Sequence, residues 1–300
     1  MFAVISRSEK EIAIDGRDAA RSSVRVPPCA LQKSFGSVDL VFSRRGDISE
    51  PRRLFQQGAM KVGFPGTEAG EPPEAVLLNL AGGLTGGDRL EFGIGLDEGS
   101  SAVITTQACE RIYRSTGEDA AVTGRIRLET AARMEWLPQA TIFFNGGRLK
   151  RETHVELAAD ASLLALECMI FGRTARGESV ASGALSDSWF VHRDGKPIHA
   201  ECFALEGAIQ TTLDKPSVLN GHRAMATLRY IAPNAQERID EMRALLVDGP
   251  EEHGTVSAAT AWNSMMIVRF IAPDGYRLNR EIGRVLRGFR RKALPRVWSL

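Results

Sequence analysis

The sequence predicts a mainly β protein: an irregular coiled or layered multi-strand β body with about two α-helices toward the C-terminus. From Arg25 to Leu213, short apolar or alternating segments are separated by Gly, Pro, Asn and Asp, which is typical of strands and turns. Clear helical periodicity is confined to two stretches after Pro233. We expect one domain over residues 1–300, with roughly residues 1–24 as a flexible N-terminal segment.

Four segments are rich enough in apolar, β-branched or aromatic residues to be strands covered on both faces. They are Ala75–Leu80, Ala102–Thr106, Met134–Phe144 and Ser162–Phe171. Each is bounded by turn-forming residues or a change of pattern, so we expect each to be one strand.

The clearest hairpin has Asp194-Gly195 at its turn, between Trp189–Arg193 and Lys196–Phe203. Asp-Gly supplies the two positive φ angles that a type I′ turn requires. His192 and His199 flank this turn and are expected to face each other as a surface cross-strand pair, with metal ligation as the alternative.

Helices are expected at Asn234–Val247 and from the N-cap Asp274 through Phe289. Each has apolar residues on one face. The other face of the second helix and its C-terminal end are basic, and we expect them to expose Arg280, Arg284, Arg287, Arg290, Arg291 and Lys292. Such a face is most often solvated or a protein contact, although phosphate and lipid headgroups are alternatives.

The composition is that of a globular protein, with 43% hydrophobic and 25% charged residues, which excludes collagen-like and disordered classes. The chain has 38 basic and 37 acidic residues, so its overall charge does not steer it to nucleic acid or anionic lipid. Its apolar runs are too short to cross a bilayer. The absence of a signal peptide and of a CxxC pair favours the cytoplasm and free thiols at Cys29, Cys109, Cys168 and Cys202.

Familiar nucleotide-binding motifs are absent. The dipeptide Gly195-Lys196 is followed by Pro197, which excludes a P-loop. The glycine-rich segment Gly82–Gly87 lacks the GxGxxG spacing and leads into another strand pattern from Asp88. It is better interpreted as a tight connection between strands.

Three acids, Glu135, Glu167 and Glu178, stand in or beside apolar β segments. A buried carboxylate needs a partner or a hydrated cavity. Arg173 and Arg176 are nearby in sequence, so ion pairs with Glu167 and Glu178 are the interpretation that the residues alone favour.

An ordered series of motifs spans nearly the whole chain and resembles the urease accessory protein D (UreD) family. The motifs are Gly82–Leu90, Thr105–Ala108 with Tyr113–Ser115, Glu135–Gln139, Phe171–Glu178 and Leu294–Trp298. Each motif alone is weak, whereas their order is specific.

The resemblance implies a non-catalytic factor for urease maturation, a scaffold or chaperone that works with the accessory proteins F and G, the latter a GTPase. Together they would deliver nickel to the urease apoprotein. It implies an irregular β fold with an internal water-filled passage, no permanently bound cofactor, and nickel(II) as transient cargo. Carboxylates suit a nickel path, and Asp88, Glu167 and Glu178 lie on motif segments, so they are the candidate residues. No nucleic-acid or membrane partner is expected.

The chain departs from the family pattern at Ala140, Asn145 and Arg176, which removes two acids and adds a cation. Two other hypotheses remain at this point. One is an acid–base enzyme using Glu135, Glu167 or Asp88 with a histidine. The other is a phosphate- or RNA-binding module that uses the basic C-terminal helix.

Overall fold

The fold is described from a computed structural model over residues 32–68, 70–173, 176–247 and 254–298. Strands make up 53% and helices 13% of the described residues, which confirms the predicted mainly β class. The body is a solenoid-like stack of β coils with three α-helices. Residues Lys33–Leu300 form one compact unit. The predicted flexible segment 1–24 lies outside the described residues.

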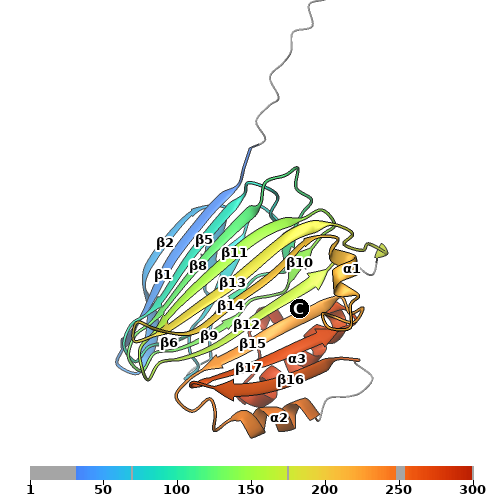
Figure 1. The fold of residues 1–300 in the computed structure, drawn as a ribbon. Coiled ribbons are helices and arrows are strands. Elements are labelled where there is room, and N and C mark those ends of the chain that lie inside the picture. The colour runs from blue at the N-terminus through green and yellow to red at the C-terminus, as the bar shows by residue number, and fades with distance from the viewer. Residues whose placement is uncertain (1–31, 69, 174–175, 248–253, 299–300) are drawn as a thin grey trace, which may run out of the picture. The chain divides into compact units, whose positions relative to one another are not determined.

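The first sheet has seven strands, of which five are mutually parallel and two are antiparallel edge strands. In spatial order they are β14 (Lys196–Gly207), β13 (Gly183–Arg193), β11 (Arg148–Leu157), β8 (Ala120–Leu128), β5 (Arg89–Leu96), β1 (Phe35–Arg45) and β2 (Ile48–Gly58). Figure 1 shows these strands side by side, from blue β1 and β2 to yellow β13. We call this sheet A.

The second sheet, sheet B, has ten strands, and four of them (β4, β6, β9 and β12) are parallel neighbours. Its main path is β16 (Val256–Trp262), β17 (Met265–Ala272), β15 (Ala224–Ile231), β12 (Ser162–Phe171), β9 (Arg133–Leu137), β6 (Ser101–Thr106), β4 (Glu74–Asn79) and β3 (Met60–Gly63). The short strands β7 (Glu110–Ile112) and β10 (Thr141–Phe143) pair with each other, and β10 also pairs with β12.

The chain alternates between the sheets, passing from β4 to β5, β6, β8, β9, β11, β12 and β13. Parallel neighbours need a crossover connection, which is usually a helix. Here a strand of the other sheet supplies each crossover, so successive turns of chain stack as coils. Side chains that point inward from both sheets therefore face one another along the whole stack.

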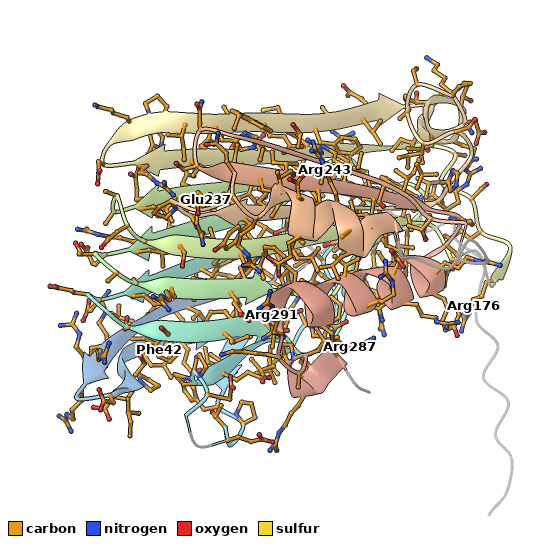
Figure 2. All side chains as sticks on the ribbon, turned by 90° about the horizontal axis from the view of Figure 1, so that it is seen from below. Phe42, Arg176, Glu237, Arg243, Arg287 and Arg291 are labelled. Carbon is orange, nitrogen blue, oxygen red and sulfur yellow. The ribbon has the colours of Figure 1, made fainter. Side chains whose placement is uncertain are left out.

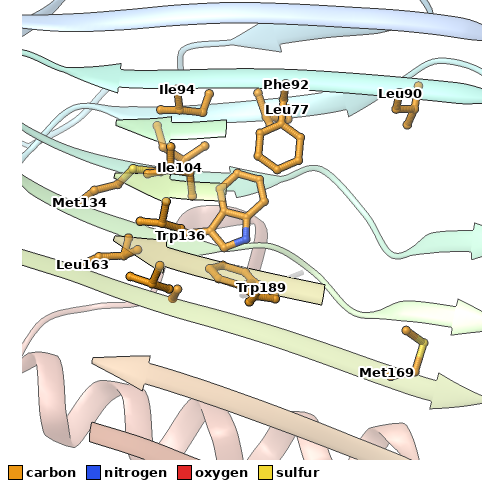
Figure 3. Packing of buried hydrophobic residues seen from close by; sticks show 14 of the residues in the cluster. Leu77, Leu90, Phe92, Ile94, Ile104, Met134, Trp136, Leu163, Met169 and Trp189 are labelled. Carbon is orange, nitrogen blue, oxygen red and sulfur yellow. The ribbon is translucent and has the colours of Figure 1, made fainter. Parts of the chain in front are cut away.

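The space between the sheets is filled mainly by apolar side chains. Strand β5 alternates buried and more exposed positions, as a strand with one inner face should. Phe92 of β5 stacks on Trp136 of β9, with ring centroids 4.7 Å apart, so the two sheets meet directly through aromatic rings. Figure 3 shows this pair together with the buried Trp189. Burial of a large apolar side chain stabilises the fold by roughly 2 to 3 kcal/mol.

The two predicted helices are confirmed with small changes in their bounds. Helix α2 covers Ile239–Val247, because residues 233–238 form turns. Helix α3 covers Gly275–Arg290, and its N-cap Asp274 accepts a hydrogen bond from the backbone amide of Arg277 at 2.9 Å. Both helices pack on the outer face of sheet B beside β15, β16 and β17 (Figure 1). A third helix, α1 (Ile209–Leu213), was not predicted because it is too short to show periodicity.

Three of the four predicted buried strands are confirmed within one residue, and the fourth is divided. The segment Met134–Phe144 forms two strands, β9 and β10, because Pro138 cannot continue a hydrogen-bonded ladder. The hairpin of β13 and β14 is confirmed: Asp194 and Gly195 have φ angles of 48° and 70°.

The glycine-rich segment connects β4 to β5 and contains no helix, as predicted. The amide of Leu84 donates to the carbonyl of Arg111, and the amide of Tyr113 donates to the carbonyl of Leu84. Gly83 has a φ of 145°, and a Cβ there would lie 2.4 Å from Tyr113 Cε2. This connection therefore requires glycine for both its backbone angle and its close contact.

We expect Gly83→Ala to destabilise the protein more than Gly117→Ala. Both glycines have φ near the same positive value, 145° and 142°, but a Cβ at position 117 meets no atom within 4 Å. Both variants place alanine at a similar positive φ, so the backbone strain is about the same in each. The difference between their losses in the free energy of unfolding, about 1 to 3 kcal/mol, then measures the steric contact with Tyr113 and Arg111. Chemical denaturation measures it, and equal losses would show that the contact costs nothing.

Candidate functional site

A cavity of about 340 Å³ lies between the two sheets. It is lined by Leu90, Phe92, Val122 and Leu149 from sheet A and by Leu77, Trp136 and Glu167 from sheet B, among others. Most of its wall is apolar, but polar and charged residues also line it, among them Gln107, Arg111, Gln139 and Arg151. We call it the inter-sheet cavity.

One part of the inter-sheet cavity is lined by Cys109, Glu110 and Asn79. Glu110 begins β7, and Asn79 ends β4. The Asn79 side-chain amide donates to both carboxylate oxygens of Glu110, at 3.2 and 3.0 Å. Burial raises the pKa of Glu110 despite this hydrogen bond, and burial also raises the pKa of the Cys109 thiol. The carboxyl is therefore held in place but poorly solvated.

A buried ion pair adjoins the cavity at Arg151 of β11 and Glu167 of β12. Arg151 Nη2 lies 2.7 Å from Glu167 Oε2 and 2.5 Å from Asp187 Oδ2, so one guanidinium serves two carboxylates. Trp136 Nε1 donates to Glu167 Oε1 at 3.1 Å. Arg151 and Asp187 belong to sheet A and Glu167 to sheet B. The contact therefore ties the two sheets together through a charge.

A second group is centred on the half-buried Glu201 of β14; in it Arg229 is buried and Arg269 is exposed. Its carboxylate contacts Arg229 Nη2 at 2.7 Å and Arg269 Nη2 at 2.6 Å. Arg229 lies over the ring of Trp189, 4.5 Å from its centroid. Together with Arg151, Glu167 and Asp187, these residues form what we call the buried ion network.

The charges in this network shift one another's protonation. Burial raises the pKa of Glu167, and Arg151 opposes that shift. Burial disfavours the charged form of Arg151, yet Asp187 and Glu167 together raise its pKa. For Glu201, burial is outweighed by His199, Arg229 and Arg269, which lower its pKa. Arg151 is therefore the cation on which the two neighbouring carboxylates depend.

The structure does not bring the three predicted path residues together at the inter-sheet cavity. Glu167 lines it, whereas Asp88 and Glu178 do not. The Asp88 carboxylate accepts the backbone amides of Ser34 at 2.7 Å and Thr85 at 2.8 Å, which fixes the turn before β5. Whether Asp88 and Glu178 contact nickel stays a prediction.

The predicted ion pairs are confirmed in part. Glu178 Oε2 lies 2.5 Å from Arg173 Nε, whereas Glu167 pairs with Arg151 and not with Arg173 or Arg176. Glu135 pairs with Arg290, Nη2 to Oε2 2.6 Å. None of these pairs joins an acid to a histidine, as the acid–base enzyme hypothesis requires.

The prediction of a His192–His199 pair is wrong. A register shift after Val191 places His199 opposite Val191 and His192 opposite Pro197. His192 Nδ1 instead lies 3.4 Å from Glu156, and His199 Nε2 lies 3.4 Å from Glu201. Within the described residues, no group of three or more His, Cys, Asp or Glu side chains is placed to hold a metal ion.

Sequence reasoning missed Glu110, Asn79, Arg151 and Asp187. A usable signal existed for Arg151. Side chains alternate between the two faces of a strand, so Arg151 lies on the same inward face of β11 as the buried Leu149, Thr153 and Val155. An arginine at an inward position indicates a buried partner. The identity of that partner depends on how the coils stack, which the sequence pattern does not specify.

Comparison with known proteins identifies the family. The profile of the UreD urease accessory protein family matches residues 34–299. The chain belongs to this family. It is 42% identical to urease accessory protein UreD of Methylobacterium sp. (strain 4-46) over 82% of this chain and 87% of that one. It is 40% identical to the UreD of Azorhizobium caulinodans over 90% and 97%, and 41% identical to UreD 1 of Brucella ovis over 90% and 96%.

Two segments that carry the UreD resemblance meet in the fold although they are far apart in sequence. Trp298 Nε1 donates to the carbonyl of Leu137 at 3.0 Å, and the Gln139 side chain donates to the carbonyl of Val297 at 3.1 Å. The Glu135–Arg290 pair lies beside them. The motif at the end of β9 thus holds Val297 and Trp298 on sheet B.

The structure shows what surrounds the three residues that depart from the UreD pattern, Ala140, Asn145 and Arg176. Asn145 Oδ1 accepts the backbone amide of Ser182 at 3.1 Å, so the amide side chain supports the connection before β13. Arg176 is exposed, and Ala140 packs against the cluster under the helices. Among the described residues, no helix is long and apolar enough to span a bilayer.

We expect Arg151→Met to destabilise the protein by about 3 to 5 kcal/mol at neutral pH, because Glu167 and Asp187 lose their shared cation. The matched control is Arg127→Met, which removes an exposed pair with Glu129 at 2.7 Å and should cost less than about 1 kcal/mol. Chemical denaturation compares the two.

The loss of unfolding free energy caused by Arg151→Met should become smaller as the pH falls. Burial and Asp187 both raise the pKa of Glu167, so the native variant binds a proton that the unfolded chain does not. Stability then rises relative to the parent protein as pH decreases toward about 5. A pH-independent difference would contradict this assignment.

Proposed function

We propose that this chain is an assembly factor for urease that, with the accessory proteins F and G, delivers nickel to the urease apoprotein. Its membership of the UreD urease accessory protein family supports a role in urease maturation. The observation that carries the nickel proposal is the inter-sheet cavity, whose lining includes Cys109, Glu110 and Glu167 beside the two cations Arg111 and Arg151. Carboxylate, thiolate and water are ligands that nickel(II) accepts.

The chemistry of these side chains suits transient binding. Burial raises the pKa of Glu110 and Cys109, which disfavours their charged, metal-binding forms. Glu167 is already paired with Arg151. A metal ion entering the cavity therefore meets ligands that attract it weakly, as a cargo that must be released requires.

We propose that the protein turns over no substrate of its own and holds no cofactor permanently. The names of its relatives, which are accessory proteins, support this. Its place of action is the cytoplasm, and its partners are proteins, with no role for nucleic acid or membranes. The C-terminal position of α3 and its contacts with Glu135 fit a structural use of several of its arginines.

The test of this function is removal of the protein from a cell that makes urease. At limiting nickel, urease should remain folded and soluble but contain little nickel and show little activity. Restoring the chain should restore both. Full urease activity in the deletion strain would contradict the proposal, as would GTP hydrolysis by the purified chain without the G protein.

The role of the inter-sheet cavity is tested separately with Glu110→Gln. Glutamine keeps the shape and the acceptor for Asn79 but removes the charge. We expect urease nickel content to fall several-fold while the complex with the partner proteins is recovered normally. Glu91→Gln is the control, because Glu91 is exposed on β5 and does not line the cavity. Equal effects of the two variants would remove the cavity from the nickel path.

A further inference from the structure

A second hollow, of about 460 Å³, lies at the amino ends of three parallel strands of sheet B. The first residues of β6, β9 and β12 are Ser101, Arg133 and Ser162. Arg133 pairs with Ser101 on one side and with Ser162 on the other. The opposite wall is formed by the C-terminal end of α3 and by residues of and before α2. We call this hollow the basic pocket.

Positive charge is concentrated here. Five cationic side chains line the basic pocket against two carboxylates: Arg133, Arg238, Arg290, Arg291 and Lys292 against Glu135 and Glu241. The whole chain, by contrast, carries a formal net charge of only +1. The basic pocket therefore has a local excess of positive charge, although the protein as a whole is nearly neutral.

The prediction that the basic end of α3 is uniformly exposed is wrong, because its cations divide into two groups. Arg290 is buried, its side chain only 5% exposed, and held by Glu135, while Arg284 is half-buried and paired with Glu281. Arg291 is 79% exposed, although it contacts Glu241 at 3.0 Å. Figure 2 shows Arg287 and Arg291 near the same end of α3. Of these arginines, Arg290 and Arg291 line the basic pocket. Lys292, which also lines it, contacts Glu71 at 2.8 Å. A ligand would therefore meet Arg291 and Lys292 at exposed ion pairs, which are weak.

The floor of the pocket is apolar. Val103, Met134 and Leu164 line it and are nearly buried, and Phe289 lies beneath Arg238, whose guanidinium carbon is 3.8 Å from the ring centroid. Arg238 Nε also donates to Glu241 at 2.8 Å. A ligand that fits must thus combine negative charge with a small apolar group.

We propose that the basic pocket docks an acidic segment of a partner protein, with carboxylates at Arg133, Arg291 and Lys292 and an apolar side chain on the floor. Charge complementarity selects acidic side chains, and the apolar floor favours a peptide over an isolated anion. The proposal concerns this surface alone and does not depend on the passage of nickel through the inter-sheet cavity.

The contacts also argue against a nucleic-acid ligand. The aromatic rings at the pocket, Phe289 and Tyr230, are buried or half-buried, and they pack edge-to-face on each other with centroids 5.2 Å apart. Bases therefore find no exposed ring on which to stack. Arg238 and Arg290 are held by Glu241 and Glu135.

The experiment uses the purified full-length chain and fluorescent peptides. The probe is a short glutamate peptide with interspersed leucines, and the comparison peptide has glutamine at every glutamate position. We expect the acidic peptide to bind and the glutamine peptide not to bind in fluorescence anisotropy. Arg133→Glu combined with Arg291→Glu should weaken binding by roughly tenfold or more.

The control variant combines Arg89→Glu with Arg125→Glu, two exposed arginines of sheet A with the same change in net charge. It should bind the acidic peptide as the parent does. Circular dichroism verifies folding, and the milder pair Arg133→Gln with Arg291→Gln should weaken binding in the same direction. Equal weakening by the sheet A control would overturn the proposal. Tighter binding of single-stranded RNA, or displacement of the peptide by inorganic phosphate, would assign the pocket to phosphate instead.

Discussion

The contact of Arg151 with Glu167 and Asp187 is the interaction on which the interior depends. A stack of coils can bury apolar side chains without any charge, so three ionised groups between the sheets need a specific arrangement to be tolerated. The arrangement here places one guanidinium within 2.7 Å of two carboxylates on different sheets. Because that contact spans the gap between the sheets, it fixes their separation beside the inter-sheet cavity and keeps a polar surface within an apolar wall.

The coil topology explains why the candidate cavity and the basic pocket lie where they do. Strands β4, β6 and β9 end at Asn79, Thr106 and Leu137, next to residues that line the inter-sheet cavity. Strands β6, β9 and β12 begin at the basic pocket. Parallel strands in register have their amino ends at one edge of the sheet and their carboxyl ends at the other. The residues at the carboxyl ends therefore gather at the inter-sheet cavity, and those at the amino ends gather at the basic pocket.

Sequence patterns predicted the elements better than they predicted the site. The hairpin at Asp194 and the N-cap at Asp274 depend on local chemistry, and both form as expected. The pairing of Glu167 with Arg151 depends on which coils are neighbours, and the register of His199 depends on a bulge after Val191. Neither is encoded by spacing along the chain. Proximity in sequence identified the partner of Glu178, Arg173, but not the partner of Glu167, which lies on a neighbouring coil.

The same pairing bears on how a metal ion would leave the inter-sheet cavity. If Glu167 bound a cation fully, Arg151 would lose one of its two carboxylates and keep only Asp187, which weakens a buried ion pair and costs stability. Glu110 carries a different constraint, because burial raises its pKa. Its ionised form is therefore costly unless a nearby cation stabilises it. On the proposed nickel path, both carboxylates would therefore attract a divalent ion while opposing its retention. Weak binding then follows from the neighbours of the acids, not from a shortage of ligands.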